Sequence, residues 1–253
     1  MLGLVLAAAL HGCAPGDAWA ASAHPLSEAA APPPGFGRVE LSSGSFAAWV
    51  RRLPVQPEGA LVRTWDGKLA PQRFYRVLRV SALPLKFRQD LEQCADWGFR
   101  LWLEYQASTR RPDDCWLLDY NGRRVRFQDW RKSGRGASLD SFFRWAASNA
   151  NSHSLKKGLG KVAGGPDLMP GDLLVQNETG GIGHASVILD VAVDGQGRRV
   201  YLIGFGFMPA QDFHVEAAGP GQGRGDWFTL EGFQEFLTEH LPYGPPVLRR
   251  FSD

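Results

Sequence analysis

A cysteine and a histidine in this chain have the types and the order that nucleophilic catalysis requires. Cys94 precedes His184, which follows a glycine and opens a largely apolar stretch over residues 185–189. A thiol is mostly protonated at neutral pH, so an imidazole must take its proton and a third polar group must fix the imidazole tautomer. We interpret Gln211 as that third group because it follows the next predicted strand. Cys94, His184 and Gln211 are therefore the candidate catalytic residues.

Cys94 also has two structural interpretations. It lies on the apolar stripe of a predicted helix with Glu92 and Asp96 nearby, and acidic neighbours raise the pKa of a thiol where catalysis needs it lowered. Packing in the core would explain the residue without any chemistry. In an oxidising compartment, Cys94 and Cys115 could instead form a disulfide.

A metal site would have to combine His214 and Glu216, which share a predicted strand face, with His184 and Asp172. No two histidines have the spacing that is typical of zinc enzymes. We therefore predict no metal site.

Cys94 belongs to the clearest predicted helix. Apolar residues recur at three- and four-residue spacing over residues 85–105, which is typical of an amphipathic helix that faces a core. Cys94 would then lie about two turns inside the helix. Further helices are predicted over residues 139–150 and from Thr229 onward, where a hydroxyl side chain can cap the first turn.

His184 opens the first strand of a predicted antiparallel hairpin. Residues 184–193 and 199–207 are joined by a glycine-containing turn, and counting from that turn places Phe207 opposite His184. A second hairpin is predicted over residues 115–127, because its Asn-Gly pair supplies the positive φ angles of a tight turn. Helices and antiparallel strands together predict the α+β fold class.

The composition is that of a water-soluble globular domain. Of the 253 residues 44% are hydrophobic, and nine Trp and fifteen Phe supply apolar area for one core. The 28 basic and 26 acidic residues leave a net charge of +2, too balanced for a nucleic-acid-binding surface. The glycine-rich loop 158–170 lacks the first glycine and the Ser or Thr of a phosphate-binding motif. We predict no nucleic-acid partner and no cofactor.

The first 23 residues are predicted to direct export. Residues 2–10 form an apolar run that is too short to span a bilayer but has the length of a signal-peptide core. Residues 10–13 match a lipoprotein site, which would place a lipid anchor on Cys13. Residues 18–20 and 21–23 match ordinary signal-peptidase sites, so both routes stay open. Either route predicts a periplasmic protein or a membrane-anchored lipoprotein.

The remainder of the chain is predicted to be one domain on a tether. Residues 24–35 are rich in proline and alanine, which is typical of a linker. Residues 36–253 are predicted to form a single α+β domain. No other stretch is long and apolar enough to cross a membrane.

A local pattern resembles the second half of papain-like cell-wall peptidases and amidases. Pro170-Gly171-Asp172 turns into a strand, and Gly183-His184 opens the next one. In those enzymes the histidine is the general base for a cysteine at the start of an earlier helix. The resemblance implies a papain-like core, with helices packed on an antiparallel sheet, and hydrolysis of amide bonds in cell-wall peptides.

Several separate motifs extend a second resemblance over most of the chain. They are Ser45-Phe46-Ala47-Ala48-Trp49, Arg52-Leu53-Pro54, Gln93-Cys94-Ala95-Asp96, Pro170-Gly171-Asp172, Gly183-His184-Ala185, Met208-Pro209-Ala210-Gln211 with His214, and Leu248-Arg249-Arg250-Phe251. With these motifs the chain resembles a family of exported bacterial proteins catalogued as a domain of unknown function (number 4846). The resemblance implies export and a shared fold, but no activity.

One departure from that family favours a protein without catalysis. Members of the family usually carry Gln-Ser-Tyr where this chain has Phe205-Gly206-Phe207. The change removes polar groups from the place where a catalytic histidine would need support. The alternative to a hydrolase is accordingly a non-catalytic envelope lipoprotein that uses the same fold for binding or structure.

Overall fold

The structure is a computed structural model that describes residues 23–71 and 74–252. The predicted export signal, its alternative cleavage sites and Cys13 lie almost entirely outside these described residues. The described chain contains the following helices: α1 (Leu26–Ala29), α2 (Phe46–Arg51), α3 (Cys94–Thr109), α4 (Phe127–Lys132), α5 (Leu139–Asn149), α6 (Ser152–Gly158) and α7 (Leu230–His240).

The strands are mostly short and all of their pairings are antiparallel. They are β1 (His24–Pro25), β2 (Phe36–Arg38), β3 (Pro54–Val55), β4 (Val77–Val80), β5 (Trp116–Leu118), β6 (Arg124–Arg126), β7 (Gly160–Lys161), β8 (Leu173–Gln176), β9 (His184–Asp194), β10 (Arg199–Phe205), β11 (His214–Glu216), β12 (Gly223–Arg224), β13 (Trp227–Phe228) and β14 (Val247–Arg250). Helices and antiparallel sheets confirm the predicted α+β class.

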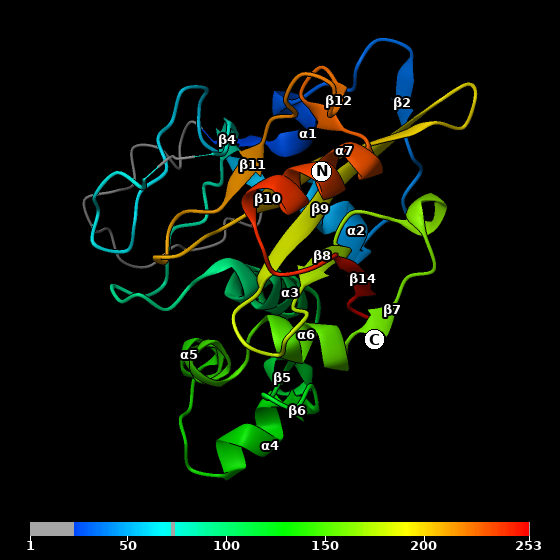
Figure 1. The fold of residues 1–253 in the computed structure, drawn as a ribbon. Coiled ribbons are helices and arrows are strands. Elements are labelled where there is room, and N and C mark those ends of the chain that lie inside the picture. The colour runs from blue at the N-terminus through cyan, green and yellow to red at the C-terminus, as the bar shows by residue number, and fades with distance from the viewer. Residues whose placement is uncertain (1–22, 72–73, 253) are drawn as a thin grey trace, which may run out of the picture.

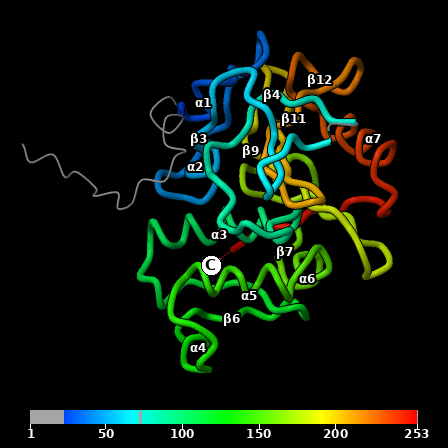
Figure 2. Tube along the Cα trace, turned by 90° about the vertical axis from the view of Figure 1, so that its left-hand side faces the viewer, coloured from blue at the N-terminus to red at the C-terminus, as the bar shows by residue number. Residues whose placement is uncertain are grey.

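One sheet organises the molecule. Its strand order is β12-β13-β10-β9-β8-β14-β7, with β11 joining β10 to β4 and with β2 paired to β9. The long strand β9 runs through its centre beside β8 and β10 (Figure 1). The β5–β6 hairpin, α4 and α5 lie together at one end of the molecule, away from α7 and β12 (Figure 1, Figure 2).

The two faces of β9 contribute to different cores. Side chains alternate along a strand, so every second residue points to the same face. Ala185, Val187 and Leu189 pack in the core that includes α3. Ile188 packs in the core that includes residues of α7, and so does Val191, because the β9–β10 register shifts by one residue between them. Side chains on neighbouring positions of β9 therefore meet different elements.

Several predicted elements are confirmed. The β9–β10 hairpin and the β5–β6 hairpin both form, and Gly122 has the positive φ of 75° that its turn requires. Helix α5 begins after Ser138, whose hydroxyl accepts the N–H of Ser141, and α7 begins after the capping residue Thr229. No helix in the described ranges is long and apolar enough to span a bilayer.

The start of α3 corrects the predicted helix. The prediction began near residue 85, but the helix begins at Cys94 and continues to Thr109. Gln93 and Asp96 form a capping box there, in which the Asp96 carboxylate accepts the N–H of Gln93 at 3.0 Å. Cys94 is consequently the first residue of the helix and not a residue two turns inside it.

The predicted tether over residues 24–35 is also wrong in part. Strand β1 pairs with β3, and α1 buries Leu26 completely. Side chains from the rest of the domain bind the segment's carbonyl groups, including Trp227 Nε1 to Ala31 O at 2.9 Å. A single leucine and free main-chain acceptors thus attach a Pro- and Ala-rich segment to the fold.

Candidate functional site

A pocket of about 470 Å³ opens at the N-terminal end of α3. We call it the α3 pocket. The start of α3, the end of α5 and the glycine-rich loop before β9 enclose it. Its lining residues are Asp90, Leu91, Gln93, Cys94, Ala95, Asp96, Tyr120, Ala147, Ala150, Asn151, Ser152, Gly180, Gly181, Ile182, Gly183 and Met208. The volume falls within the range of small-ligand sites.

Cys94 lines this pocket and is only 6% exposed. Its Sγ is 3.8 Å from the carbonyl oxygen of Gly183, to which the thiol donates. Burial raises the pKa of Cys94 to about 11, against the opposing effect of the Ala185 N–H, and the Asp96 carboxyl raises it further. The thiol is therefore protonated at neutral pH.

His184 points away from Cys94. In the sheet it pairs with Gln176, and Ser186 pairs with Leu174 of the α7-side core, so these side chains share the face opposite α3. The imidazole Nε2 lies 3.0 Å from Ser186 Oγ, while Nδ1 has no hydrogen-bond partner among the described residues. Burial lowers the pKa of His184 to about 3. The thiol thus contacts the main chain beside His184 and not its ring.

Gln211 is buried between other partners. Its amide Nε2 donates to Tyr75 Oη at 3.1 Å, and its main-chain oxygen accepts the indole N–H of Trp97 at 3.0 Å. No hydrogen bond joins Gln211 to His184 in the described part of the chain. The predicted catalytic set is therefore not assembled as side chains in contact, and its catalytic role stays a prediction.

The face opposite α3 carries a buried group that we call the histidine cluster: Tyr75, His184, Ser186, His214 and Glu216. His214 Nε2 lies 3.1 Å from Glu216 Oε2, and its ring stacks on Tyr75 with centroids 4.6 Å apart. Burial lowers the pKa of His214 to about 3, with a further lowering by His184, and burial raises the pKa of Glu216 to about 8. The cluster holds its imidazoles neutral.

Phe205 separates the two imidazoles of the cluster. Its ring centroid lies 5.1 Å from that of His184 and 4.5 Å from that of His214. The next residue, Gly206, faces α3, where an added Cβ would overlap the indole of Trp97. Phe205 and Gly206 therefore pack against aromatic rings, and this packing leaves His184 without a polar partner from β10.

Asp96 is a site residue that sequence reasoning treated only as a neighbour of Cys94. Its side chain lines the α3 pocket, is 6% exposed, and its Oδ1 has no hydrogen-bond partner among the residues that the structure describes. Burial raises the pKa of Asp96 well above its usual value, and the nearby Glu92 adds to the effect. The Gln93-x-x-Asp96 capping pattern is the sequence signal that locates it.

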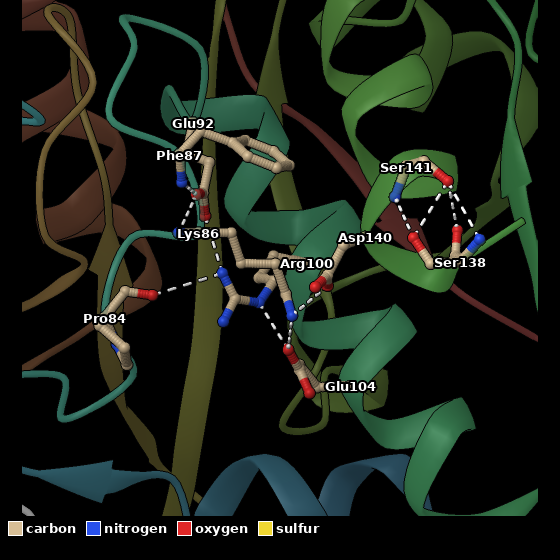
Figure 3. Close-up of polar contacts among 9 residues, drawn as sticks. All are labelled: Pro84, Lys86, Phe87, Glu92, Arg100, Glu104, Ser138, Asp140 and Ser141. Carbon is tan, nitrogen blue, oxygen red and sulfur yellow. Dashed lines mark hydrogen bonds and ion pairs between the residues drawn. The ribbon is translucent and has the colours of Figure 1, made fainter. Parts of the chain in front are cut away.

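A buried ion pair fixes the segment that leads into α3 (Figure 3). Arg100 Nη1 lies 2.8 Å from Glu92 Oε2, and Arg100 Nε lies 2.7 Å from Glu104 Oε1. Glu92 also accepts the main-chain N–H groups of Lys86 and Phe87. The network joins the loop before α3 to the second turn of the helix, and so positions Cys94 and Asp96.

The geometry also bears on the remaining alternatives from the sequence. Cys94 and Cys115 are free thiols, so they do not form a disulfide. Asp172 forms an ion pair with Arg250 at 2.6 Å and does not join the histidine cluster. No group of three or more His, Cys, Asp or Glu side chains within the described ranges is placed to hold a metal ion.

Comparison with known proteins places the chain in one family. The model of the family described as a domain of unknown function (4846) matches residues 26–157 and residues 132–250. Comparisons with curated proteins and with solved structures find no match. The resemblance to papain-like enzymes is accordingly not confirmed. Because the two matches together span most of its length, the chain belongs to the family of the domain of unknown function 4846.

Proposed function

We propose that this protein is an exported cell-envelope protein that binds a ligand in the α3 pocket and does not hydrolyse it. The observation that carries the proposal is the pocket itself, whose lining includes a buried thiol and a buried carboxyl without an imidazole in contact. Export is proposed from the apolar run over residues 2–10 and from the family. A lipid on Cys13 would keep the binding domain at a membrane surface.

Binding is favoured over catalysis by the state of Cys94. A thiol with a pKa of about 11 is ionised in roughly one molecule in ten thousand at pH 7. The imidazole that would have to accept its proton is completely buried on the other face of β9. Its low pKa also makes it a weak base.

Cell-wall peptides are the ligand class that we propose. The α3 pocket offers a thiol, a carboxyl and the polar residues Asn151 and Ser152 next to a run of glycines. Donors and acceptors of this kind at a pocket wall suit the alternating donors and acceptors of a peptide. The Pro-Gly-Asp and Gly-His motifs that resemble wall peptidases support the same class.

A cysteine peptidase or amidase is the second candidate. It is favoured by one observation: Cys94 is the first residue of a sixteen-residue helix and lines a pocket. A helix N-terminus lowers the pKa of a thiol when water can reach it. Hydrolysis would require the His184 ring to leave the histidine cluster and turn toward Cys94.

A binding and cleavage assay with the peptide fraction of digested cell walls tests the proposal. Wild-type protein and Cys94→Ser are expected to retain the same peptides without shortening them. Ala147→Trp, which fills the α3 pocket from an incompletely buried position on α5, is expected to lose retention. Cleavage by the wild type that disappears in Cys94→Ser would overturn the binding proposal in favour of the hydrolase.

A further inference from the structure

The charge that lines the α3 pocket has one sign. Its acidic lining residues are Asp90 and Asp96, and no Lys, Arg or His is among the described residues that line it. Glu92 is near Asp96 but does not line the pocket, and it is paired with the buried Arg100. A ligand group that enters the pocket therefore meets carboxyl groups without a protein cation beside them.

Asp96 supplies a second, independent observation. One of its oxygens caps α3, and the other, Oδ1, is buried without a partner in the described structure. A buried carboxyl that lacks a cation or a donor is destabilised by the loss of its hydration. A ligand that donates hydrogen bonds and carries a positive charge removes that penalty.

Asp90 is held in a fixed position near the same end of the helix. Its Oδ1 accepts the N–H of Ala210 at 2.7 Å and the side-chain amide of Gln93 at 3.0 Å. These bonds keep a second carboxyl at the pocket wall without a charged partner in the pocket. The two carboxyls form an acidic end of the pocket, where a cation would stabilise their charged form.

The rest of the pocket suits an alkyl stem. Met208 lines the wall, and Ile182 and Tyr120 are 67% and 48% exposed at its lining. Apolar side chains around a charged end are the usual surroundings of a long cationic side chain, whose methylene groups pack while the ammonium reaches an acceptor.

Building on the proposed function, we infer that the α3 pocket binds the protonated primary amine of its ligand, with the ammonium against Asp96 and its alkyl stem along Met208 and Ile182. The ligand class is a peptide with a free amino group on a diamino acid side chain. Asp96 is the residue that selects the amine, and Asp90 strengthens the local negative potential.

Calorimetric titration of the full chain with two probes that share the same alkyl stem tests this inference. The probes are Nα-acetyl-lysine amide, which carries an ammonium, and its Nε-acetylated form, which does not. The ammonium probe is expected to bind saturably and at least about tenfold more tightly than the acetylated probe. Asp96→Asn, which keeps an oxygen for the helix cap, is expected to lower the affinity for the ammonium probe at least about tenfold. Asp140→Asn on the exposed surface of α5 is the matched control and should bind as the wild type does.

Equal binding of the two probes, or undiminished binding by a folded Asp96→Asn variant, would overturn the inference. So would no saturable binding of the ammonium probe up to about 10 mM. The failure is distinguishable from failure of the proposed function. If Asp96→Asn still retains wall peptides and Ala147→Trp does not, the pocket remains the binding site and only the recognition of an amine by Asp96 is overturned. Ala147→Trp also tests the location if Asp96→Asn fails to fold, because ammonium binding that survives the filled pocket would overturn the inference.

Discussion

On its two faces, β9 buries polar groups in different ways. On the α3 side, the Cys94 thiol and the Asp96 carboxyl line a pocket, and one carboxyl oxygen has no partner in the described chain. On the α7 side, His184 and His214 are completely buried with Ser186, Tyr75 and Glu216. The first group lines a pocket, and the second is a closed part of the core.

The comparison shows why a favourable chain order does not by itself make a catalytic pair. Cys94 reaches the main chain at Gly183 and Ala185, on both sides of His184. The period of two in a strand sends the intervening side chain to the opposite face. Main-chain proximity and side-chain separation are thus consequences of the same geometry.

The largest expected effect follows from breaking the buried ion pair that fixes the start of α3. Arg100→Leu removes the buried guanidinium and leaves Glu92, which is 1% exposed, without its cation. Losing one partner of a buried ion pair is expected to lower the free energy of unfolding by about 3–5 kcal/mol. Urea unfolding of the wild type and the variant measures it.

The matched control for that variant is Asp140→Asn. It breaks the Lys86–Asp140 ion pair, in which the Asp140 side chain is 64% exposed. An exposed pair contributes about 0–1 kcal/mol. If the two variants lowered stability equally, the buried pair would not be what fixes the start of α3.

The second prediction concerns the closed side and its response to pH. The folded pKa of His184 is about 3, below its ordinary value of 6.5. Between these values the unfolded chain binds a proton at this residue and the folded protein does not, so falling pH destabilises the folded state. Relative to His184→Gln, the wild type is expected to lose about 1.4 kcal/mol of unfolding free energy per pH unit in this window.

Unfolding measured for both proteins at several pH values between 3.5 and 7.5 checks that difference, because shared titrations of other groups cancel. A stability difference that is constant over this range would mean that the imidazole takes up its proton in the folded state. The histidine cluster would then not be closed to water.

The smallest effect probes the boundary between the two sides. Gly206→Ala adds a Cβ that would overlap the indole of Trp97, a side chain held by its hydrogen bond to Gln211 O. Overpacking of this kind is expected to lower the free energy of unfolding by about 1–3 kcal/mol. Gly195→Ala, whose Cβ would meet nothing within 4 Å, should change it by less than about 0.5 kcal/mol. If both variants lowered the stability equally in thermal unfolding, close packing of residue 206 against Trp97 would not be the cause of the loss.

Much of the fold was predictable because local signals agree with it. Capping by Ser138 and Thr229 and the Asn-Gly turn at Gly122 each act within a few residues. The start of α3 was not found because apolar spacing continues back through Leu85 and Leu91, whereas the capping box that begins the helix involves Gln93, an unusual capping residue.

The site was harder to predict than the fold. Alternation along β9 separates His184 from Ala185 by face, but only tertiary packing determines which face α3 covers. The orphan oxygen of Asp96 likewise depends on the loop before β9 and on α5, which are distant in sequence. The ordering of residues 24–35 depends on strands and side chains far along the chain, such as Trp227.

Thiol labelling tests the central claim, that Cys94 belongs to a binding pocket and is not activated by His184. The full chain and His184→Gln are treated with iodoacetamide between pH 5 and 9, and the modified cysteines are assigned by peptide mapping, which separates Cys94 from Cys115 and Cys13. We predict that Cys94 reacts only after unfolding or with a midpoint above the ~8.5 of a free thiol, equally in both proteins. A midpoint clearly below ~8.5 in the wild type that is lost in His184→Gln would contradict this account and establish a thiolate and imidazole pair.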